Sequence, residues 1–255
     1  MKKIKATVAA ALGWFKRTVK NEPIPMSLML ASAIGIAVTT AVVKENALTT
    51  LPLYVSLLIG VLTAGANRYA NLLGSINCIF YTLVYIYFGL YGQALQALLI
   101  SCPIQMVTFV MWHRRAYKSS THFRSLKLWQ VLSILALMAV SYVGMSFFLD
   151  AAGASYPYLD NAITVISTVQ IILALLSFRE FSWVALPVCV LLVILDVVMI
   201  ANEPIRIAYL IYSAHALLCA VRQFFSVRRI YREQREGDAE AAESTVCPED
   251  ADGVA

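Results

Sequence analysis

Long apolar runs, separated by short polar links, make up most of this 255-residue chain. Eight such runs lie near residues 26–43, 47–65, 70–88, 92–112, 127–149, 158–178, 181–201 and 205–225. A helix needs roughly 20 predominantly apolar residues to cross the hydrocarbon core of a bilayer. The pattern therefore predicts an all-α membrane protein with eight transmembrane helices.

The two ends of the chain follow different patterns. Within residues 1–22, Ile4, Val8, Leu12, Phe15 and Val19 recur at helical spacing opposite lysines, which predicts an amphipathic helix on the membrane surface. A signal peptide is the alternative, but no convincing small-residue cleavage site precedes Lys44. Residues 236–255 are acidic and poor in large apolar side chains, which predicts a disordered tail.

The positions of the basic residues indicate the orientation. With the N-terminus inside and eight spans, every Lys and Arg except Lys44 and Arg206 lies in an inside segment. Asp150 and Asp160 then flank an outer loop. Seven or nine spans would remove this asymmetry. By the positive-inside rule, we expect both termini in the cytoplasm. We expect the protein itself in the plasma membrane.

Composition narrows the class of protein further. Hydrophobic residues make up 60% of the chain and charged residues 14%, against about 25% charged in soluble domains. The net charge of +5 resides in the links between apolar runs, so it indicates topology and not nucleic-acid binding. The five cysteines show no metal-ligand spacing, and we expect no metal and no cofactor. The expected partners are membrane lipid and a small molecule.

The lengths of the links predict an internal repeat. Spans two to four are joined by very short links, as are spans six to eight, and span five stands between the two triplets. One odd span between two triplets makes both triplets enter the membrane in the same direction, as in transporters built from parallel repeats. We therefore predict a 1 + 3 + 1 + 3 arrangement within a single transporter domain, residues 23–235. Its parts are a first three-helix bundle (47–112), a linker helix (127–149) and a second bundle (158–225).

Polar side chains within the first bundle are the first candidates for a binding site. Asn77, Tyr81 and Tyr85 are spaced by four residues and share one helix face. Beside aromatic rings, amides and hydroxyls suit a planar ring attached to a polyhydroxylated sugar.

The next span carries a second polar face. Gln105, Thr108 and Trp112 lie on one side of it. On a straight helix Gln96 would point away from Gln105, so both face one cavity only if Pro103 reorients the two halves. For Thr108, an interhelical hydrogen bond is the simpler role.

The second bundle supplies further candidates. In span six Asp160, Thr164 and Ser167 form one stripe, with Gln170 beside it, and for Thr164 an interhelical hydrogen bond is again the simpler role. The ionisable residues away from span ends are Asp196 and His215. Such residues are functional candidates by default. The alternatives are that Asp196 reaches water at the span end and that His215 bonds a neighbouring helix.

Several reaction classes find no support in the sequence. The chain has no HExxH, GxSxG or Walker A pattern. The basic residues nearest the membrane interior, Arg206 and Arg222, lie near span ends, so we expect no group to neutralise a phosphate. No carboxylate cluster suggests a sodium or proton site. These observations favour facilitated diffusion of an unphosphorylated ligand and argue against an enzyme.

Two segments resemble the nicotinamide riboside transporter (PnuC) family of bacterial vitamin transporters. The first includes Asn71 to Gly74, Tyr81, Gly89-Leu90-Tyr91-Gly92, and Pro103-Ile104-Gln105 to Trp112. The second runs from Leu159 to Val165, through Ser167 and Gln170, to Phe181-Ser182-Trp183. The resemblance implies a SWEET-like fold of two three-helix bundles. It also implies a homotrimer in the bacterial inner membrane and passive uptake of nicotinamide riboside.

We therefore expect a transporter with alternating access and a substrate site built from both bundles. Tyr81, Trp112 and Trp183 would stack on the base. Asn77, Gln96, Gln105 and Gln170 would bond the amide and the ribose. The full set of expected site residues is Asn77, Tyr81, Tyr85, Gln96, Gln105, Trp112, Thr164, Ser167, Gln170, Trp183, Asp196 and His215.

Two alternatives remain open at this point. Many relatives carry a second tryptophan at the position of Leu186, so thiamine or another vitamin or nucleoside is an alternative substrate. An intramembrane enzyme that uses His215 and Asp196 is an alternative of another class.

Overall fold

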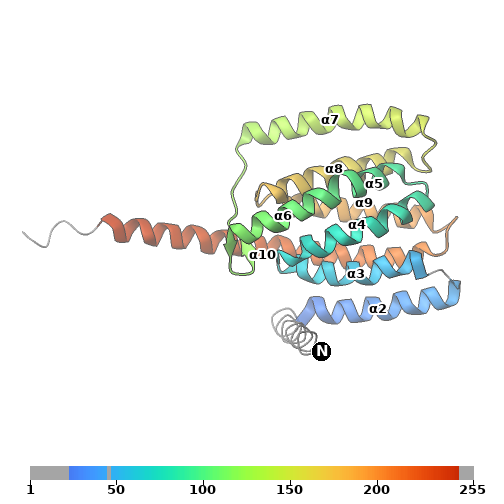
Figure 1. Cartoon of the computed structure of the whole chain (residues 1–255), viewed down its shortest axis with the longest axis horizontal. Coiled ribbons are helices and arrows are strands. Elements are labelled where there is room, and N and C mark those ends of the chain that lie inside the picture. Colours follow the sequence, from blue (N-terminus) through green and yellow to red (C-terminus); the bar gives the residue numbers. More distant parts are fainter. Residues whose placement is uncertain (1–22, 45–46, 247–255) are drawn as a thin grey trace, which may run out of the picture.

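Helices that run side by side along one axis form nearly the whole molecule in the computed structural model, which describes residues 23–44 and 47–246 (Figure 1). The predicted N-terminal arm lies outside the described residues. The helices are α2 (Pro23–Val43), α3 (Ala47–Ala64), α4 (Tyr69–Tyr87), α5 (Tyr91–Leu95), α6 (Cys102–Arg114), α7 (Leu128–Ala151), α8 (Pro157–Leu175), α9 (Phe181–Met199) and α10 (Arg206–Val246). A π-helical segment, η1 (Gln96–Ser101), joins α5 to α6 without a break.

The helices follow the predicted apolar runs in number and order. Within the described residues, seven helical stretches are long and apolar enough to cross a membrane, with α5, η1 and α6 counted as one. The eighth, α3, has a shorter apolar stretch, Thr49–Ala64. Many large apolar side chains are exposed on these helices, as expected for surfaces that face lipid.

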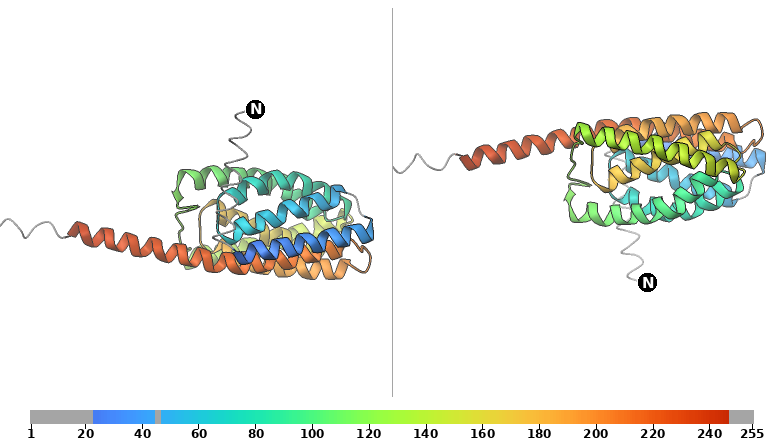
Figure 2. Two further views of the ribbon diagram at one scale, coloured as in Figure 1. Left: turned by 90° about the horizontal axis from the view of Figure 1, so that it is seen from below. Right: turned by 90° about the horizontal axis from the view of Figure 1, so that it is seen from above.

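Six of these spans form a closed ring. Contacts run from α3 to α4, from α4 to α6, from α5 and α6 to α8, from α8 to α9, from α9 to α10, and from α10 back to α3. The other two spans lie outside the ring, α2 against α3 and α10, and α7 against α8 (Figures 1 and 2). The ring brings helices from both predicted bundles around one interior.

Buried apolar clusters fill the ring at both ends. At the end where α4 ends and α10 begins, the cluster includes Phe88, Leu90, Leu195 and Ile205. At the other end it includes Trp112, Phe123, Leu173, Phe181 and Val227. Each cluster combines residues from the first and the second predicted bundle.

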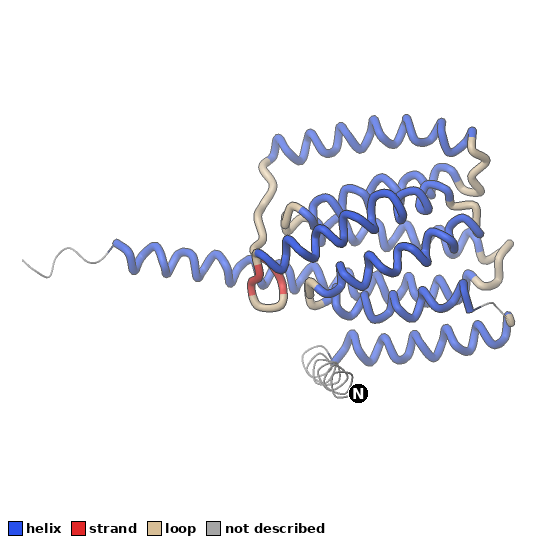
Figure 3. The backbone as a smooth tube through the Cα atoms, in the orientation of Figure 1, coloured by secondary structure: helices blue, strands red, loops and turns tan. Residues whose placement is uncertain are grey.

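A small hairpin marks the second of these ends (Figure 3). Strands β1 (Ala116–Tyr117) and β2 (Ser120–Thr121) pair antiparallel in the loop between α6 and α7. The Gln234 side chain of α10 accepts a hydrogen bond from the Phe123 N–H and donates one to the Thr121 carbonyl. Lys118 donates a 2.6 Å hydrogen bond to Glu233, which raises the pKa of the lysine. The hairpin thus fastens the loop to α10.

Helix α10 is longer than the sequence predicts. The predicted span ends near residue 225 and the predicted disordered tail begins at 236, whereas the helix continues to Val246 beyond the bundle (Figure 1). Ala and Glu dominate residues 239–243 and are strong helix formers. Extending an existing helix also requires no new nucleus. The prediction of disorder therefore needs correction for residues 236–246, and the rest of the predicted tail lies outside the described residues.

Candidate functional site

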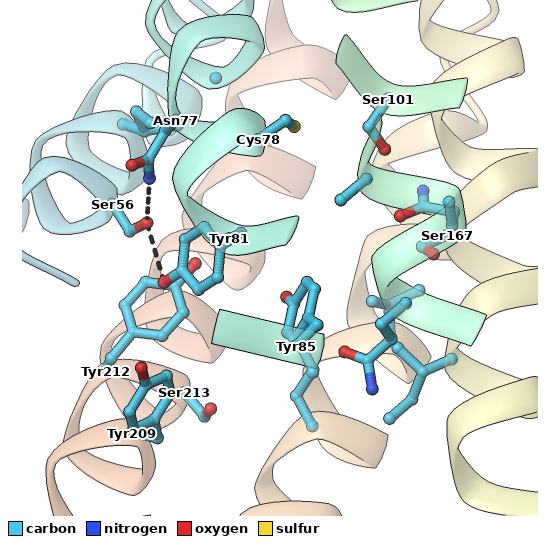
Figure 4. Close-up of a pocket in the computed structure, with 18 of the residues that line it drawn as sticks. Ser56, Asn77, Cys78, Tyr81, Tyr85, Ser101, Ser167, Tyr209, Tyr212 and Ser213 are labelled. Atoms are coloured by element: carbon cyan, nitrogen blue, oxygen red, sulfur yellow. Dashed lines mark hydrogen bonds between the residues drawn. The ribbon is translucent and has the colours of Figure 1, made fainter. Parts of the chain in front are cut away.

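A cavity of about 220 Å³, lined by polar and apolar side chains, lies inside the ring. All six ring spans line it, from Ser56 on α3 to Ser213 on α10 (Figure 4). Pockets for drug-sized ligands typically measure about 300–1,000 Å³, so this cavity suits a small, compact ligand.

The predicted polar face of α4 lines this cavity. Asn77, Tyr81 and Tyr85 all line it, because residues four apart lie on one side of a helix. The Asn77 amide nitrogen donates to the Ser56 hydroxyl at 2.7 Å and to the Pro52 carbonyl at 3.1 Å. The Ser56 hydroxyl donates to the Tyr81 hydroxyl at 3.0 Å (Figure 4). The amide oxygen of Asn77 is buried without a hydrogen-bond partner among the described residues.

Tyrosine rings make up the aromatic part of the wall. Tyr81 and Tyr85 stack with their ring centroids 5.3 Å apart, and Tyr81 lies 6.5 Å from Tyr212. Tyr209 also lines the cavity, and its hydroxyl donates to the Thr49 carbonyl at 2.6 Å. Tyrosine rings can bind a planar or cationic group through a free π face. Tyr209 and Tyr212 were not among the predicted site residues.

The π-helical segment brings Gln96 and Gln105 to the same cavity. The segment ends two residues before Pro103, which lacks an N–H and crowds the preceding turn. A π-turn changes the number of residues per turn, so it shifts the phase of the residues on either side. The expected reorientation of the two halves is therefore present, and its site is the π-helical segment.

Gln105 is packed closely against α4. A Cβ atom placed on Gly74 would lie only 2.0 Å from the Gln105 side-chain oxygen. The Gln105 amide nitrogen lies 3.6 Å from the Cys78 sulfur. Gly74 is thus the residue that allows Gln105 to reach the cavity.

Asp160 holds the start of α5 and does not line the cavity. Its carboxylate accepts hydrogen bonds from the backbone N–H groups of Gly92 at 2.8 Å and Gln93 at 3.0 Å. Negative charge at a helix N-terminus is stabilising. The contact positions the neighbouring Gln93, whose side chain lines the cavity.

A buried ion pair lies in the cavity wall. Arg206 donates through Nη1 to Asp196 at 3.0 Å, and both side chains are at most 4% exposed. Ser213 donates to the second oxygen of Asp196. Arg206 was predicted to lie near a span end, and it is the first residue of α10. Its burial beside Asp196 was not predicted, because this burial arises from the short turn after α9. The sequence feature that could have predicted this pair is the presence of opposite charges, Asp196 and Arg206, on the two sides of a short link.

Seven of the twelve expected site residues line the cavity, namely Asn77, Tyr81, Tyr85, Gln96, Gln105, Ser167 and Asp196. The other five lie elsewhere. The two expected tryptophans are among them. Trp112 is buried in the apolar cluster near the hairpin and donates to the Ala174 carbonyl at 2.8 Å. Trp183 is 54% exposed on the outer surface, against Phe224.

Thr164, Gln170 and His215 also lie outside the lining of the cavity. Thr164 is buried where α8 packs on Gly92 of α5. Gln170 is half-buried and does not line the cavity. His215 is buried, with Nε2 3.3 Å from the Leu57 carbonyl oxygen, which fits the expected bond to a neighbouring helix. Within the described part of the chain, no group of three or more His, Cys, Asp or Glu residues could hold a metal ion.

Known proteins similar to this chain are transporters. Residues 46–224 match the family described as nicotinamide mononucleotide transporter. The chain is 32% identical over 127 residues to the nicotinamide riboside transporter PnuC of Neisseria mucosa. That match covers 47% of this chain and 48% of the relative, so about half the length of each protein is aligned.

The fold has a counterpart among solved structures. The crystal structure of the vitamin B3 transporter PnuC matches with a TM-score of 0.72 and 22% identity, over 87% of this chain and 98% of that one. This match confirms the predicted all-α membrane fold. The family match covers more than half of the chain and agrees with the resemblance found in the sequence. The chain therefore belongs to the nicotinamide mononucleotide transporter family, whose members are transporters and not enzymes.

Proposed function

We propose that this protein carries nicotinamide riboside across the bacterial inner membrane by facilitated diffusion. The observation that carries the proposal is the cavity inside the ring, which is lined by both amide side chains and tyrosine rings. The similarity of half the chain to a nicotinamide riboside transporter supports the same substrate.

The chemistry of the cavity matches the parts of this substrate. Nicotinamide riboside consists of a cationic pyridinium ring with a carboxamide, joined to a ribose. The faces of Tyr81, Tyr85 and Tyr212 would attract the pyridinium ring, because aromatic faces attract cations. The amide side chains of Gln93, Gln96 and Gln105, which line the cavity, would bond the carboxamide and the hydroxyls, since buried polar groups need hydrogen-bond partners.

The charge of the cavity favours the riboside over its phosphate ester. Among the described residues that line the cavity, Arg206 is the one cation and Asp196 the one carboxylate, and they neutralise each other. A phosphomonoester carries about −1.5 to −2 charges at neutral pH and would lose its hydration without a net positive partner.

Transport would proceed by alternating opening of the two ends of the ring. The triplet α3 to α6 and the triplet α8 to α10 would act as the two three-helix bundles, with α7 as the linker helix. Contacts join these triplets at both ends: Asp160 to the start of α5 at one, and Trp112 to Ala174 at the other. Opening of one end would require the Asp160 hydrogen bonds to break, and opening of the other would require the Trp112–Ala174 hydrogen bond to break.

The proposal also includes the membrane orientation and the oligomeric state of the protein. Positive charge in the links supports an inner-membrane protein with both termini in the cytoplasm. The resemblance to the PnuC family supports a homotrimer. Native mass spectrometry of the purified protein tests the trimer, and a monomer or dimer would contradict it.

A ligand panel tests the substrate directly. Thermal unfolding of the purified, detergent-solubilised protein is measured with nicotinamide riboside, thiamine, riboflavin and nicotinamide. We expect the riboside to raise the unfolding temperature in a concentration-dependent way, because a ligand that binds only the folded state stabilises it. Stabilisation by thiamine and not by the riboside would overturn the choice of substrate.

A further inference from the structure

The ion pair in the cavity wall has an unusual pattern of satisfied and unsatisfied groups. Arg206 uses Nη1 for Asp196, while its Nε and Nη2 are buried without a hydrogen-bond partner among the described residues. These two nitrogens lie on the same edge of the guanidinium, the edge that binds two oxygens of a carboxylate or phosphate at once. One edge of Arg206 is therefore occupied and a second donor edge is left unused.

Aromatic rings restrict the position of this guanidinium. Its central carbon lies 3.9 Å from the centroid of the Phe88 ring and 4.9 Å from that of Tyr209. Stacking on rings and burial hold the cation at the cavity wall, since an arginine in such contacts has little freedom to turn away. The charge state of the wall then depends on Asp196.

We propose that Asp196 determines specificity by cancelling the charge of Arg206, so that the cavity accepts the unphosphorylated nucleoside and rejects its 5′-phosphate. This inference rests on the proposed function. With the carboxylate in place, the two unused donors of Arg206 stay buried, and the Asp196 carboxylate repels a phosphate that approaches the same guanidinium. Removal of the carboxylate charge leaves an uncompensated cation with two free donors, which is a phosphate site.

The test compares wild-type protein with Asp196→Asn, using isothermal titration and thermal unfolding. The probes are nicotinamide riboside, nicotinamide mononucleotide and inorganic phosphate, with chloride at matched ionic strength as the salt control. We expect Asp196→Asn to bind the mononucleotide roughly ten- to a hundredfold more tightly than the wild type does, as for a gained charge-assisted hydrogen-bond pair.

Two control variants separate charge from shape. Asp196→Glu keeps the negative charge and should still reject the mononucleotide. The double variant Asp196→Asn, Arg206→Gln removes both charges and should reject it as well. Equal mononucleotide affinity in the single and the double variant would overturn the proposal, and so would unchanged mononucleotide affinity in a folded Asp196→Asn protein.

A second route covers the case in which Asp196→Asn does not fold, because loss of one partner of a buried pair is strongly destabilising. Ser213 already donates to Asp196, so Ser213→Lys adds a cation to the same carboxylate without removing it. This variant should gain mononucleotide binding, and no gain would contradict the proposal.

The phosphate probe separates failure of this inference from failure of the proposed function. If the wild type binds no riboside, the proposed function fails. Stabilisation of Asp196→Asn by phosphate, absent from the wild type and from the double variant, would still support charge cancellation by Asp196. Absence of any difference among the three proteins would overturn it.

Discussion

Gly74 controls the position of one of the polar side chains in the cavity. A methyl group at this position would lie 2.0 Å from the Gln105 side-chain oxygen, so Gly74→Ala must displace Gln105. We expect riboside affinity to fall about tenfold, the effect of losing one or two hydrogen bonds. Isothermal titration of the variant measures the change.

Gly144→Ala on α7 is the matched control for this prediction. A Cβ atom there would meet nothing within 4 Å, so riboside affinity should stay at the wild-type value. Unchanged affinity in Gly74→Ala would show that Gln105 does not contact the substrate.

The aromatic residues give a second comparison at this scale. Tyr81 lines the cavity, whereas Trp183 lies outside it and is 54% exposed. Tyr81→Leu should weaken riboside binding roughly three- to thirtyfold through loss of a ring face and of the Ser56 contact. Trp183→Leu should leave the affinity unchanged. The reverse order in a titration experiment would indicate that the base binds elsewhere.

Sequence alone could identify some of these residues and not others. Asn77, Tyr81 and Tyr85 could be placed on one face because α4 is a regular helix, for which spacing determines direction. Trp112 and Trp183 could not be placed, because a tryptophan near a span end suits an apolar cluster or the membrane interface as well as a ligand. The burial of Arg206 beside Asp196 was not predicted, because it depends on a turn between two helices and not on the position of Arg206 within either helix.

Asp160 acts at the scale of the element, since it joins α8 to the start of α5. Asp160→Asn would replace one acceptor oxygen by a donor and leave a backbone N–H of Gly92 or Gln93 without a partner. A buried unsatisfied group costs about 1–3 kcal/mol. We expect the unfolding temperature to fall by roughly 2–10 °C in a chain of this size.

Asp150→Asn is the control for this substitution, because Asp150 is an exposed carboxylate near the end of α7. Thermal unfolding of both variants in detergent measures the difference. Equal unfolding temperatures would mean that Asp160 does not stabilise the start of α5.

Helix boundaries could be predicted closely where apolar runs end in polar links, as at Tyr69–Tyr87 and Phe181–Met199. The sequence predicted that the two halves of the span must reorient for Gln96 and Gln105 to face one cavity. It did not predict that a π-helical segment produces this change. Pro103 was the visible cause, but the sequence does not show whether a proline kinks a helix or is preceded by a π-turn. The extension of α10 was missed because charge and low hydrophobicity suggest disorder, whereas Ala and Glu also favour a helix.

The orientation of the whole molecule is open to a labelling experiment. Lys118 lies in the hairpin at one end of the ring, and Asn202 in the link between α9 and α10 at the other. In a background without native cysteines, Asn202→Cys should react with a membrane-impermeant thiol reagent on intact cells. Lys118→Cys should react only after the membrane is opened. The opposite pattern would place both termini outside.

Uptake by proteoliposomes tests the central claim most directly. Purified protein is reconstituted in vesicles, and entry of labelled nicotinamide riboside is compared with entry of labelled nicotinamide mononucleotide and thiamine. We expect saturable riboside entry that stops at equal inside and outside concentrations without an ion gradient, and no entry of the other two above empty vesicles. No riboside entry above empty vesicles, or entry of thiamine in its place, would contradict the account.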